Sequence, residues 1–403
     1  MSTLVTVNML NNVITGTLPD TIGDLGMLQY LILTANNMTG RLPDSLFIFN
    51  DLRELILDGN IFSGTINPAI GNVPNLESFS VFGSIMSGSL PASIGQSTTI
   101  KFVDITGNAL TGTIPEFSTS SRIEQLLLPS MSLVGPIPQS LASVPTLEYL
   151  IVSGNSLTGT LPDFSMNDGS LRAIFLDDNQ LTGSVENFLS TTPPDSLEGI
   201  VLEVNMLSGS LPASIRQYTG LIELRLESNM ISGELPSELG ILTNMKDLRL
   251  RRNNITGPIP TQLGTMAALD TIRLENNYLT GVIPTELGRL TLLTTLRLSI
   301  NNLSGLIPRQ LGALSALETL YLDFNQLSGS IPSELASLNA LRYLYLSNNQ
   351  LTGNVDVFCA TDNGLEEFAV NNCSAETIVC TCCNVCCAPG PSYECSDLIP
   401  ANI

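Results

Sequence analysis

The chain has 403 residues, of which 16 are Lys or Arg and 37 are Asp or Glu, so its net charge is −21 at pH 7. This acidity opposes non-specific binding to nucleic acid or anionic lipid and favours solubility. The absence of His excludes Ser-His, Cys-His and His-metal sites, and no GxxxxGK(S/T) phosphate loop occurs. The sequence contains no run of 18 apolar residues, so it predicts no membrane-spanning helix. We therefore expect a protein that is not an enzyme and uses no cofactor.

A 24-residue pattern recurs about fifteen times from the first residues onward, and residues 317–340 are its clearest copy. In this copy Leu320 and Leu322 flank Tyr321, as in a short strand whose side chains point to alternate faces. Gly329 permits a turn that a side chain would obstruct, and Pro332 suits a loop or an edge. One such unit cannot bury its own apolar face, whereas stacked units form a continuous core.

At a fixed place after the predicted strand, thirteen of the fifteen repeats have an Asn. A buried Asn carries two donors and an acceptor, so it can bond the backbone of its own coil and the next. The most regular part of this predicted ladder comprises Asn229, Asn253, Asn277, Asn301 and Asn325. Ser84 and Met131 interrupt the ladder, and we expect looser coils there, although Ser can still form a hydrogen bond and Met cannot.

The consensus LxxLxLxxNxLxGxIPxxLGxL resembles the plant-type leucine-rich repeat, and the resemblance covers roughly residues 1–358. It implies a leucine-rich repeat solenoid, a right-handed β/α superhelix. A parallel concave sheet of about fifteen strands would have a second short sheet beside it and 3₁₀ or loop segments on the convex side. Met1–Leu4 already lies inside a repeat with no capping segment before it. We therefore expect the N-terminal cap, the signal peptide and any membrane anchor to be missing from this chain.

The outward residue between the two strand leucines forms a column whose chemistry changes along the chain. Its first part is mainly apolar, which is typical of a protein or peptide surface but also of ordinary strand propensity: Ile32, Ile56, Leu127, Ile151, Phe175 and Val201. Its second part holds four Arg and two Tyr: Arg225, Arg249, Arg273, Arg297, Tyr321 and Tyr345.

The Arg row has two interpretations, because neighbouring strands lie about 4.8 Å apart and nearby carboxylates can neutralise the row. One is a charge ladder that keeps the sheet soluble. The other is a recognition strip, since Arg presents planar forks to anions and Tyr an aromatic platform. We favour recognition and predict a ligand-binding concave face formed by Arg225, Arg249, Arg251, Arg273, Arg297, Tyr321, Tyr345, Glu227, Glu275 and Asp323.

Ser or Thr also recurs three residues after most ladder positions, often on both sides of a Gly, as at Thr15 and Thr17. Regular hydroxyl rows on a flat solenoid face are a feature of some ice-binding proteins. The alternative is that these residues belong to the repeat motif itself.

Residues 359–403 depart from the repeat and contain every cysteine of the chain: Cys359, Cys373, Cys380, Cys382, Cys383, Cys386, Cys387 and Cys395. An even number crowded into a terminal segment predicts a disulfide-stapled cap in an oxidising compartment. A thiolate site for zinc or copper is the alternative. The segment resembles the tails of algal and diatom-like leucine-rich repeat proteins. Asn-x-Ser/Thr sequons predict glycans at Asn37, Asn254 and Asn302.

We expect an extracellular recognition module of a receptor-like protein that binds a protein, peptide or anionic glycan on its concave face. A secreted inhibitor of cell-wall glycosidases is the main alternative, because the plant polygalacturonase inhibitors share this repeat. An intracellular scaffold is a third possibility, which the cysteine-dense tail disfavours.

Overall fold

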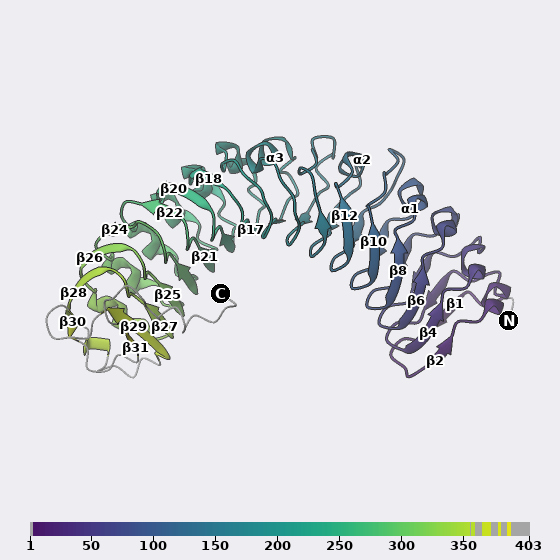
Figure 1. Ribbon diagram of the computed structural model, residues 1–403, viewed down its shortest axis with the longest axis horizontal. Coiled ribbons are helices and arrows are strands. Elements are labelled where there is room, and N and C mark those ends of the chain that lie inside the picture. The colour runs from purple at the N-terminus through teal and green to yellow at the C-terminus, as the bar shows by residue number, and fades with distance from the viewer. Residues whose placement is uncertain (1–2, 355, 359–364, 372–377, 380–384, 388–403) are drawn as a thin grey trace. The chain divides into compact units, whose positions relative to one another are not determined.

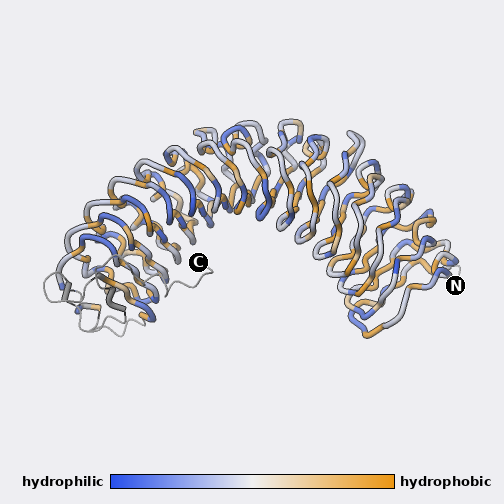
Figure 2. The backbone as a smooth tube through the Cα atoms, in the orientation of Figure 1, coloured by the Kyte–Doolittle hydropathy of each residue, from blue (hydrophilic) through white to orange (hydrophobic). Residues whose placement is uncertain are grey.

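The computed structural model describes residues 3–354, 356–358, 365–371, 378–379 and 385–387. It divides into two units, Met1–Leu207 and Ser208–Ile403. Each repeat of the sequence forms one coil, which contains a main-sheet strand, a turn, a strand of a second sheet, and in most coils a short helix. In Figure 2, hydrophobic segments recur once per coil and alternate with hydrophilic turns. The expected leucine-rich repeat solenoid is confirmed.

In the described part of the first unit, the main sheet consists of nine parallel strands with successive coils adjacent (Figure 1). They are β1 (Thr6–Asn8), β3 (Tyr30–Ile32), β5 (Glu54–Ile56), β7 (Ser78–Ser80), β9 (Phe102–Asp104), β11 (Gln125–Leu127), β13 (Tyr149–Ile151), β15 (Ala173–Phe175) and β16 (Gly199–Val201). The second sheet contains β2 (Thr15–Thr17), β4 (Asn37–Arg41), β6 (Ile61–Thr65), β8 (Ile85–Ser89), β10 (Ala109–Gly112), β12 (Ser132–Gly135) and β14 (Ser156–Leu157). The helices are η1 (Asp20–Asp24), η2 (Asp44–Phe47), η3 (Pro68–Asn72), α1 (Ala92–Gln96), α2 (Gln139–Ala142) and α3 (Val185–Thr191).

In the described part of the second unit, the main sheet has eight parallel strands. They are β17 (Glu223–Arg225), β19 (Asp247–Arg249), β21 (Thr271–Arg273), β23 (Thr295–Arg297), β25 (Thr319–Tyr321), β27 (Tyr343–Tyr345), β29 (Glu367–Asn371) and β31 (Val385–Cys387). Two short sheets lie beside it: β18 (Ser232–Glu234), β20 (Asn254–Pro258) and β22 (Tyr278–Thr280), then β24 (Ser304–Gly305), β26 (Gln326–Ser330), β28 (Gln350–Asn354) and β30 (Ile378–Val379). The helices are η4 (Ala213–Gln217), η5 (Ser237–Ile241), η6 (Thr261–Thr265), η7 (Thr285–Arg289), η8 (Arg309–Ala313), η9 (Ser333–Ser337) and η10 (Asp356–Phe358).

The main sheet continues past the predicted end of the solenoid at residue 358. Strand β29 pairs with β27 in the same parallel register, and β31 pairs with β29. Parallel strand pairing therefore extends into the segment predicted to be a separate cap. The predicted disulfides themselves lie outside the described residues, except that Cys386 and Cys387 belong to the backbone of β31.

The core is formed by the apolar positions of the repeat. In residues 317–340 the seven recurring apolar side chains are buried, with exposed fractions between 0 % and 8 %: Leu317, Leu320, Leu322, Leu327, Ile331, Leu335 and Leu338. Since each coil leaves its own apolar face open, burial depends on the two coils beside it. No helix of the described residues is long and apolar enough to cross a bilayer, and α3, with seven residues, is the longest helix among them.

The ladder asparagines bond the preceding coil rather than the next one. The Nδ2 of Asn277 donates to the carbonyl of Leu274 in its own coil at 3.1 Å and to that of Leu250 in the preceding coil at 3.0 Å. Its Oδ1 accepts a hydrogen bond from the N–H of Ile255, also in the preceding coil. The same three bonds recur at Asn253, Asn301 and Asn325.

The expectation that Ser84 would still form a hydrogen bond is wrong. The Ser84 side chain is buried, and its hydroxyl oxygen has no hydrogen-bond partner among the described residues. A Ser side chain is one bond shorter than Asn and lacks the amide fork, so it cannot span the two carbonyls that an Asn reaches.

The hydroxyl side chains of the second sheet do not form the regular rows that an ice-binding face would need. Main-sheet partners are mostly 24 residues apart, but second-sheet partners in the first unit are mostly 22 apart, so the register slips by two residues per coil. Thr39 therefore lies between Thr17 and Ile61, and Ser63 lies between Arg41 and Ile85. Hydroxyl groups meet in short diagonal runs that apolar or charged residues interrupt.

Candidate functional site

The predicted Arg and Tyr column is in register on the main sheet of the second unit. Each member is paired with the corresponding residue of the next strand: Arg225, Arg249, Arg273, Arg297, Tyr321 and Tyr345. The column follows from the repeat, because equal coil lengths bring the same repeat position onto neighbouring strands. All six side chains are partly exposed.

The first two Arg of the column are neutralised by acidic neighbours. Arg225 Nη2 lies 3.0 Å from a Glu223 carboxylate oxygen and 2.9 Å from one of Asp247. Arg249 Nε donates to the other oxygen of Asp247 at 2.8 Å. This part of the column therefore matches the charge-ladder interpretation, in which alternating charges satisfy one another across strands.

The next two Arg have no such neighbours, since Thr271 and Thr295 occupy the positions that Glu223 and Asp247 fill earlier. Among the described residues, no carboxylate lies within ion-pair distance of Arg273 or Arg297, and the Nε of each is buried without a hydrogen-bond partner. Burial, followed by the charge of Arg273, lowers the pKa of Arg297. A guanidinium still carries its charge at neutral pH.

Two stacked tyrosines continue the column. The ring centroids of Tyr321 and Tyr345 are 4.4 Å apart, with the planes inclined at 64°, and the Arg297 guanidinium lies 4.6 Å from the Tyr321 centroid. The Tyr345 hydroxyl donates a hydrogen bond to Glu367 on β29. Burial and this carboxylate raise the pKa of Tyr345, so the ring presents a neutral phenol.

A second line of side chains forms the floor beside this column. Arg251 lies between Glu227 and Glu275, and its Nη1 is 3.9 Å from a Glu275 oxygen. Further along, the Ser299 hydroxyl donates a hydrogen bond to buried Asp323. Burial raises the pKa of Glu275, and it raises that of Asp323 to about 6 because the hydrogen bond from Ser299 only partly compensates.

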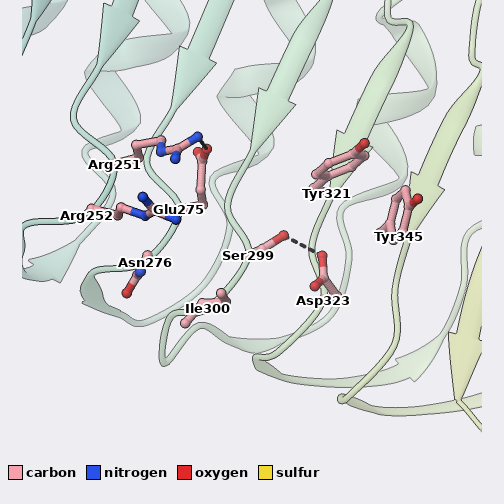
Figure 3. Close-up of a pocket in the computed structure, with 9 residues that line it drawn as sticks. All are labelled: Arg251, Arg252, Glu275, Asn276, Ser299, Ile300, Tyr321, Asp323 and Tyr345. Atoms are coloured by element: carbon pink, nitrogen blue, oxygen red, sulfur yellow. Dashed lines mark hydrogen bonds and ion pairs between the residues drawn. The ribbon is translucent and has the colours of Figure 1, made fainter. Parts of the chain in front are cut away.

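Together these residues enclose a pocket of about 140 Å³ (Figure 3). Its lining consists of Arg251, Arg252, Glu275, Asn276, Ser299, Ile300, Tyr321, Asp323 and Tyr345. Ile300, at the rim, has a φ of 54°, as do Arg252 (52°) and Asn276 (58°) at the same position of the two preceding coils, so this left-handed conformation belongs to the turn of the repeat. The Ile300 side chain is 45 % exposed.

The structure brings only part of the predicted ligand-binding set to this pocket. Arg251, Glu275, Tyr321, Asp323 and Tyr345 line it, whereas Arg225, Arg249, Arg273, Arg297 and Glu227 do not. The other four lining residues are absent from the predicted set: Arg252, Asn276, Ser299 and Ile300. Asn276 and Ile300 occupy the repeat position of Arg252, and Ser299 occupies that of Arg251, so the pocket continues two positions of the repeat.

The apolar part of the column lies in the first unit. Its members are in register, and Ser80 and Asp104 interrupt them. Val201 is buried, and the other five are half-buried rather than freely exposed. Asn37, Asn254 and Asn302 are exposed and therefore accessible to modification. No group of three or more acidic, Cys or His side chains in the described residues could hold a metal ion.

Family models for the leucine rich repeat match residues 243–303 and 291–351, and a second leucine rich repeat model matches residues 146–167. A comparison with curated proteins found no match.

Solved structures of plant receptors are similar over most of the chain. The Arabidopsis receptor kinase HAESA, in complex with the peptide hormone IDA and the co-receptor SERK1, is 30% identical with a TM-score of 0.77; the match covers 92% of this chain and 71% of that one. A TDR receptor is 27% identical with a TM-score of 0.79, covering 94% and 69%.

The ectodomain of the plant membrane receptor kinase GASSHO1/SCHENGEN3 from Arabidopsis thaliana, in complex with CASPARIAN STRIP INTEGRITY FACTOR 2, is 28% identical with a TM-score of 0.75. The match covers 91% of this chain but only 50% of that one, so this chain spans half the length of that ectodomain.

Proposed function

The chain belongs to the leucine-rich repeat family, and we propose that its second unit is a non-catalytic module that recognises a protein or peptide ligand. The ligand would lie on the main-sheet face, against Arg273, Arg297, Tyr321 and Tyr345. The observation that carries the proposal is the absence of any described carboxylate within ion-pair distance of Arg273 and Arg297, although Arg225 and Arg249 in the same column are paired.

The difference between the two halves of the column matters energetically. An Arg that already holds a carboxylate gains little from a ligand anion, because the new contact replaces an existing one. The guanidinium groups of Arg273 and Arg297 are partly desolvated and hold no carboxylate within ion-pair distance, so a ligand carboxylate or sulfate would find donors that no described acid occupies. Arg and Tyr side chains are also the commonest binding hot spots.

The similar receptors support a peptide or protein ligand. The HAESA structure contains a peptide hormone and a co-receptor, and the GASSHO1/SCHENGEN3 structure contains CASPARIAN STRIP INTEGRITY FACTOR 2. By analogy, we propose that this chain functions outside the cell or at its surface, in a receptor-like protein.

Location can be tested on protein secreted from a eukaryotic host by counting thiols and weighing glycans in one mass spectrum. We expect few or no free thiols among the eight cysteines and glycans on Asn37, Asn254 and Asn302. Eight free thiols on protein without glycans would contradict an extracellular location.

Ligand binding can be tested with a random peptide library displayed on phage and selected on the intact chain. Peptides that bind wild type should lose at least about tenfold in affinity against Arg273→Glu and Arg297→Glu, because each change replaces a cation that holds no carboxylate with an anion. The matched control is Arg289→Glu, since Arg289 is exposed at the end of η7. Selected peptides that ignore both main-sheet substitutions would refute the proposed face.

A further inference from the structure

The floor of the pocket contains a carboxylate that the protein itself does not satisfy. Glu275 is 8 % exposed, and neither of its carboxylate oxygens has a hydrogen-bond partner among the described residues. Its one ionic contact, with Arg251 Nη1, is 3.9 Å long, beyond hydrogen-bond distance. Leaving a buried charged group without donors costs more than leaving a neutral one, so this carboxylate is prepared for a donor from outside.

Asp323 places a second carboxylate on the same floor. It lies two coils further along, roughly 9–10 Å away at ordinary strand spacing, and it is 4 % exposed. Ser299 stands between the two acids and is small, which leaves the hollow open there. Tyr321 and Tyr345 form one wall, so the hollow combines buried acids with aromatic surface (Figure 3).

We propose that this pocket receives a basic group of the bound peptide, an ammonium or a guanidinium, with Glu275 as its main hydrogen-bond acceptor. This inference rests on the proposed function, because it assigns one subsite of the same ligand surface. A cation brings the donors that Glu275 lacks, and it lies favourably against the faces of Tyr321 and Tyr345.

An anion fits the pocket less well than a cation. A carboxylate bound over Ser299 would face Glu275 on one side and Asp323 on the other, and like charges at such distances repel strongly when water is excluded. Arg251 and Arg252 lie at one end only, and Arg251 already faces Glu275. Burial raises the pKa of both carboxyl groups, and at Glu275 this effect outweighs the opposing charges of Arg297 and Arg251.

The test is a double-mutant cycle on the peptides selected from the displayed library. Each Lys is replaced by norleucine and each Arg by citrulline, which removes the charge and keeps the shape. Dissociation constants are then measured by calorimetry against wild type, Glu275→Gln and Asp323→Asn, with exposed Glu234→Gln on β18 as the matched control. Circular dichroism checks that every variant is folded. If Glu275→Gln does not fold, the double-mutant cycle is completed with Asp323→Asn.

Against wild type, one neutral replacement should weaken binding about tenfold or more, and against Glu275→Gln the same replacement should have little further effect. Peptides with acetylated and free N-termini distinguish a side-chain cation from the terminal amine. Equal losses on both proteins would overturn the cation subsite. If peptides with the neutral replacement bind as tightly as the original peptides while Arg297→Glu still abolishes binding, the cation subsite is refuted and the proposed ligand face is not. If Arg297→Glu also has no effect on binding, the proposed function is refuted as well.

Discussion

A single buried amide holds two coils together at the end of each main-sheet strand. The Asn277 side chain is 6 % exposed, and it satisfies one N–H and two carbonyl groups that would otherwise be buried without partners. The first ladder residue, Asn12, has no coil before it among the described residues, and its side-chain amide donates only to carbonyls of its own coil. Asn12 is therefore a control for Asn277, because it has the same place in the repeat without the bonds to a preceding coil.

Asn277→Ala should lower the free energy of unfolding by about 1–3 kcal/mol, because it leaves the backbone groups of two coils unpaired. Asn12→Ala should cost clearly less, since Asn12 is exposed. Denaturant unfolding followed by circular dichroism measures both variants. Equal midpoints for Asn277→Ala and wild type would show that the ladder does not stabilise the stack.

The buried carboxyl group of Asp323 reduces stability at neutral pH. Its pKa is about 6 in the folded protein against an ordinary value of 3.8, because burial penalises the charged form. Between these two values the folded state binds the proton more tightly than the unfolded state, so stability falls as pH rises through this window. Above pH 6 the full penalty applies.

Asp323→Asn should therefore stabilise the chain at pH 7.5 by about 1–2 kcal/mol, and the gain should disappear below about pH 4. Asn keeps an oxygen that can accept the Ser299 hydrogen bond. Thermal unfolding at both pH values measures the difference, and Asp270→Asn, at an exposed position, is the control. A gain independent of pH would mean that the charge of Asp323 is not the cause.

At the scale of the element, the short helices of the second unit stack through glycine. A Cβ placed on Gly288 in η7 would lie 2.3 Å from the carbonyl oxygen of Gln310 in η8, and the equivalent atom on Gly264 would lie 2.4 Å from that of Glu286. Neither glycine has a positive φ, so the requirement is close approach and not backbone conformation. Ala336 takes the same place in η9.

Gly288→Ala should destabilise the protein by about 1–3 kcal/mol through overpacking, although alanine is the better helix former. Ala336→Gly, the reverse change at the equivalent position, should cost about 1 kcal/mol or less. Denaturant midpoints compare the two. A gain in stability for Gly288→Ala would mean that backbone entropy outweighs the close contact.

The sequence predicts the elements well where one repeat position determines one contact. The Arg and Tyr column depends only on the 24-residue period, and the structure has it in register. Arg225 and Arg249 form ion pairs because Glu223 and Asp247 occupy the repeat position two residues before them. Arg273 and Arg297 do not, because Thr271 and Thr295 occupy that position. The difference can therefore be predicted only if this second position is compared along the chain as well. The pocket floor depends on side-chain conformations and on the small size of Ser299, which the repeat pattern does not encode.

At the scale of the whole molecule, net charge dominates the long-range electrostatics. Exposed ion pairs such as Arg53–Glu77 and Arg172–Glu198 contribute only tenths of a kcal/mol each, about 0.2–1 for typical surface pairs. Against them stands a net charge of −21, whose self-repulsion destabilises the folded chain. Screening by salt should therefore stabilise the folded chain, because it weakens the net repulsion more than it weakens the ion pairs.

Raising NaCl from about 0.05 M to 0.5 M at pH 7 shortens the Debye length from over 10 Å to about 4 Å and should raise the urea midpoint. Near pH 4.2, the isoelectric point of the sequence, the same salt step should have little effect. A lower midpoint in salt at pH 7 would mean that the ion pairs outweigh the net repulsion.

The two-residue slip of the second sheet has a consequence for how such a chain can grow by duplication. Copying one coil places identical residues side by side on the main sheet, since partners there occupy the same repeat position. On the second sheet the same copy places each residue beside a different position of its twin. Gene duplication alone can therefore lay down a uniform strip on one face of the molecule, whereas an ordered pattern on the other face requires two separate positions to change together.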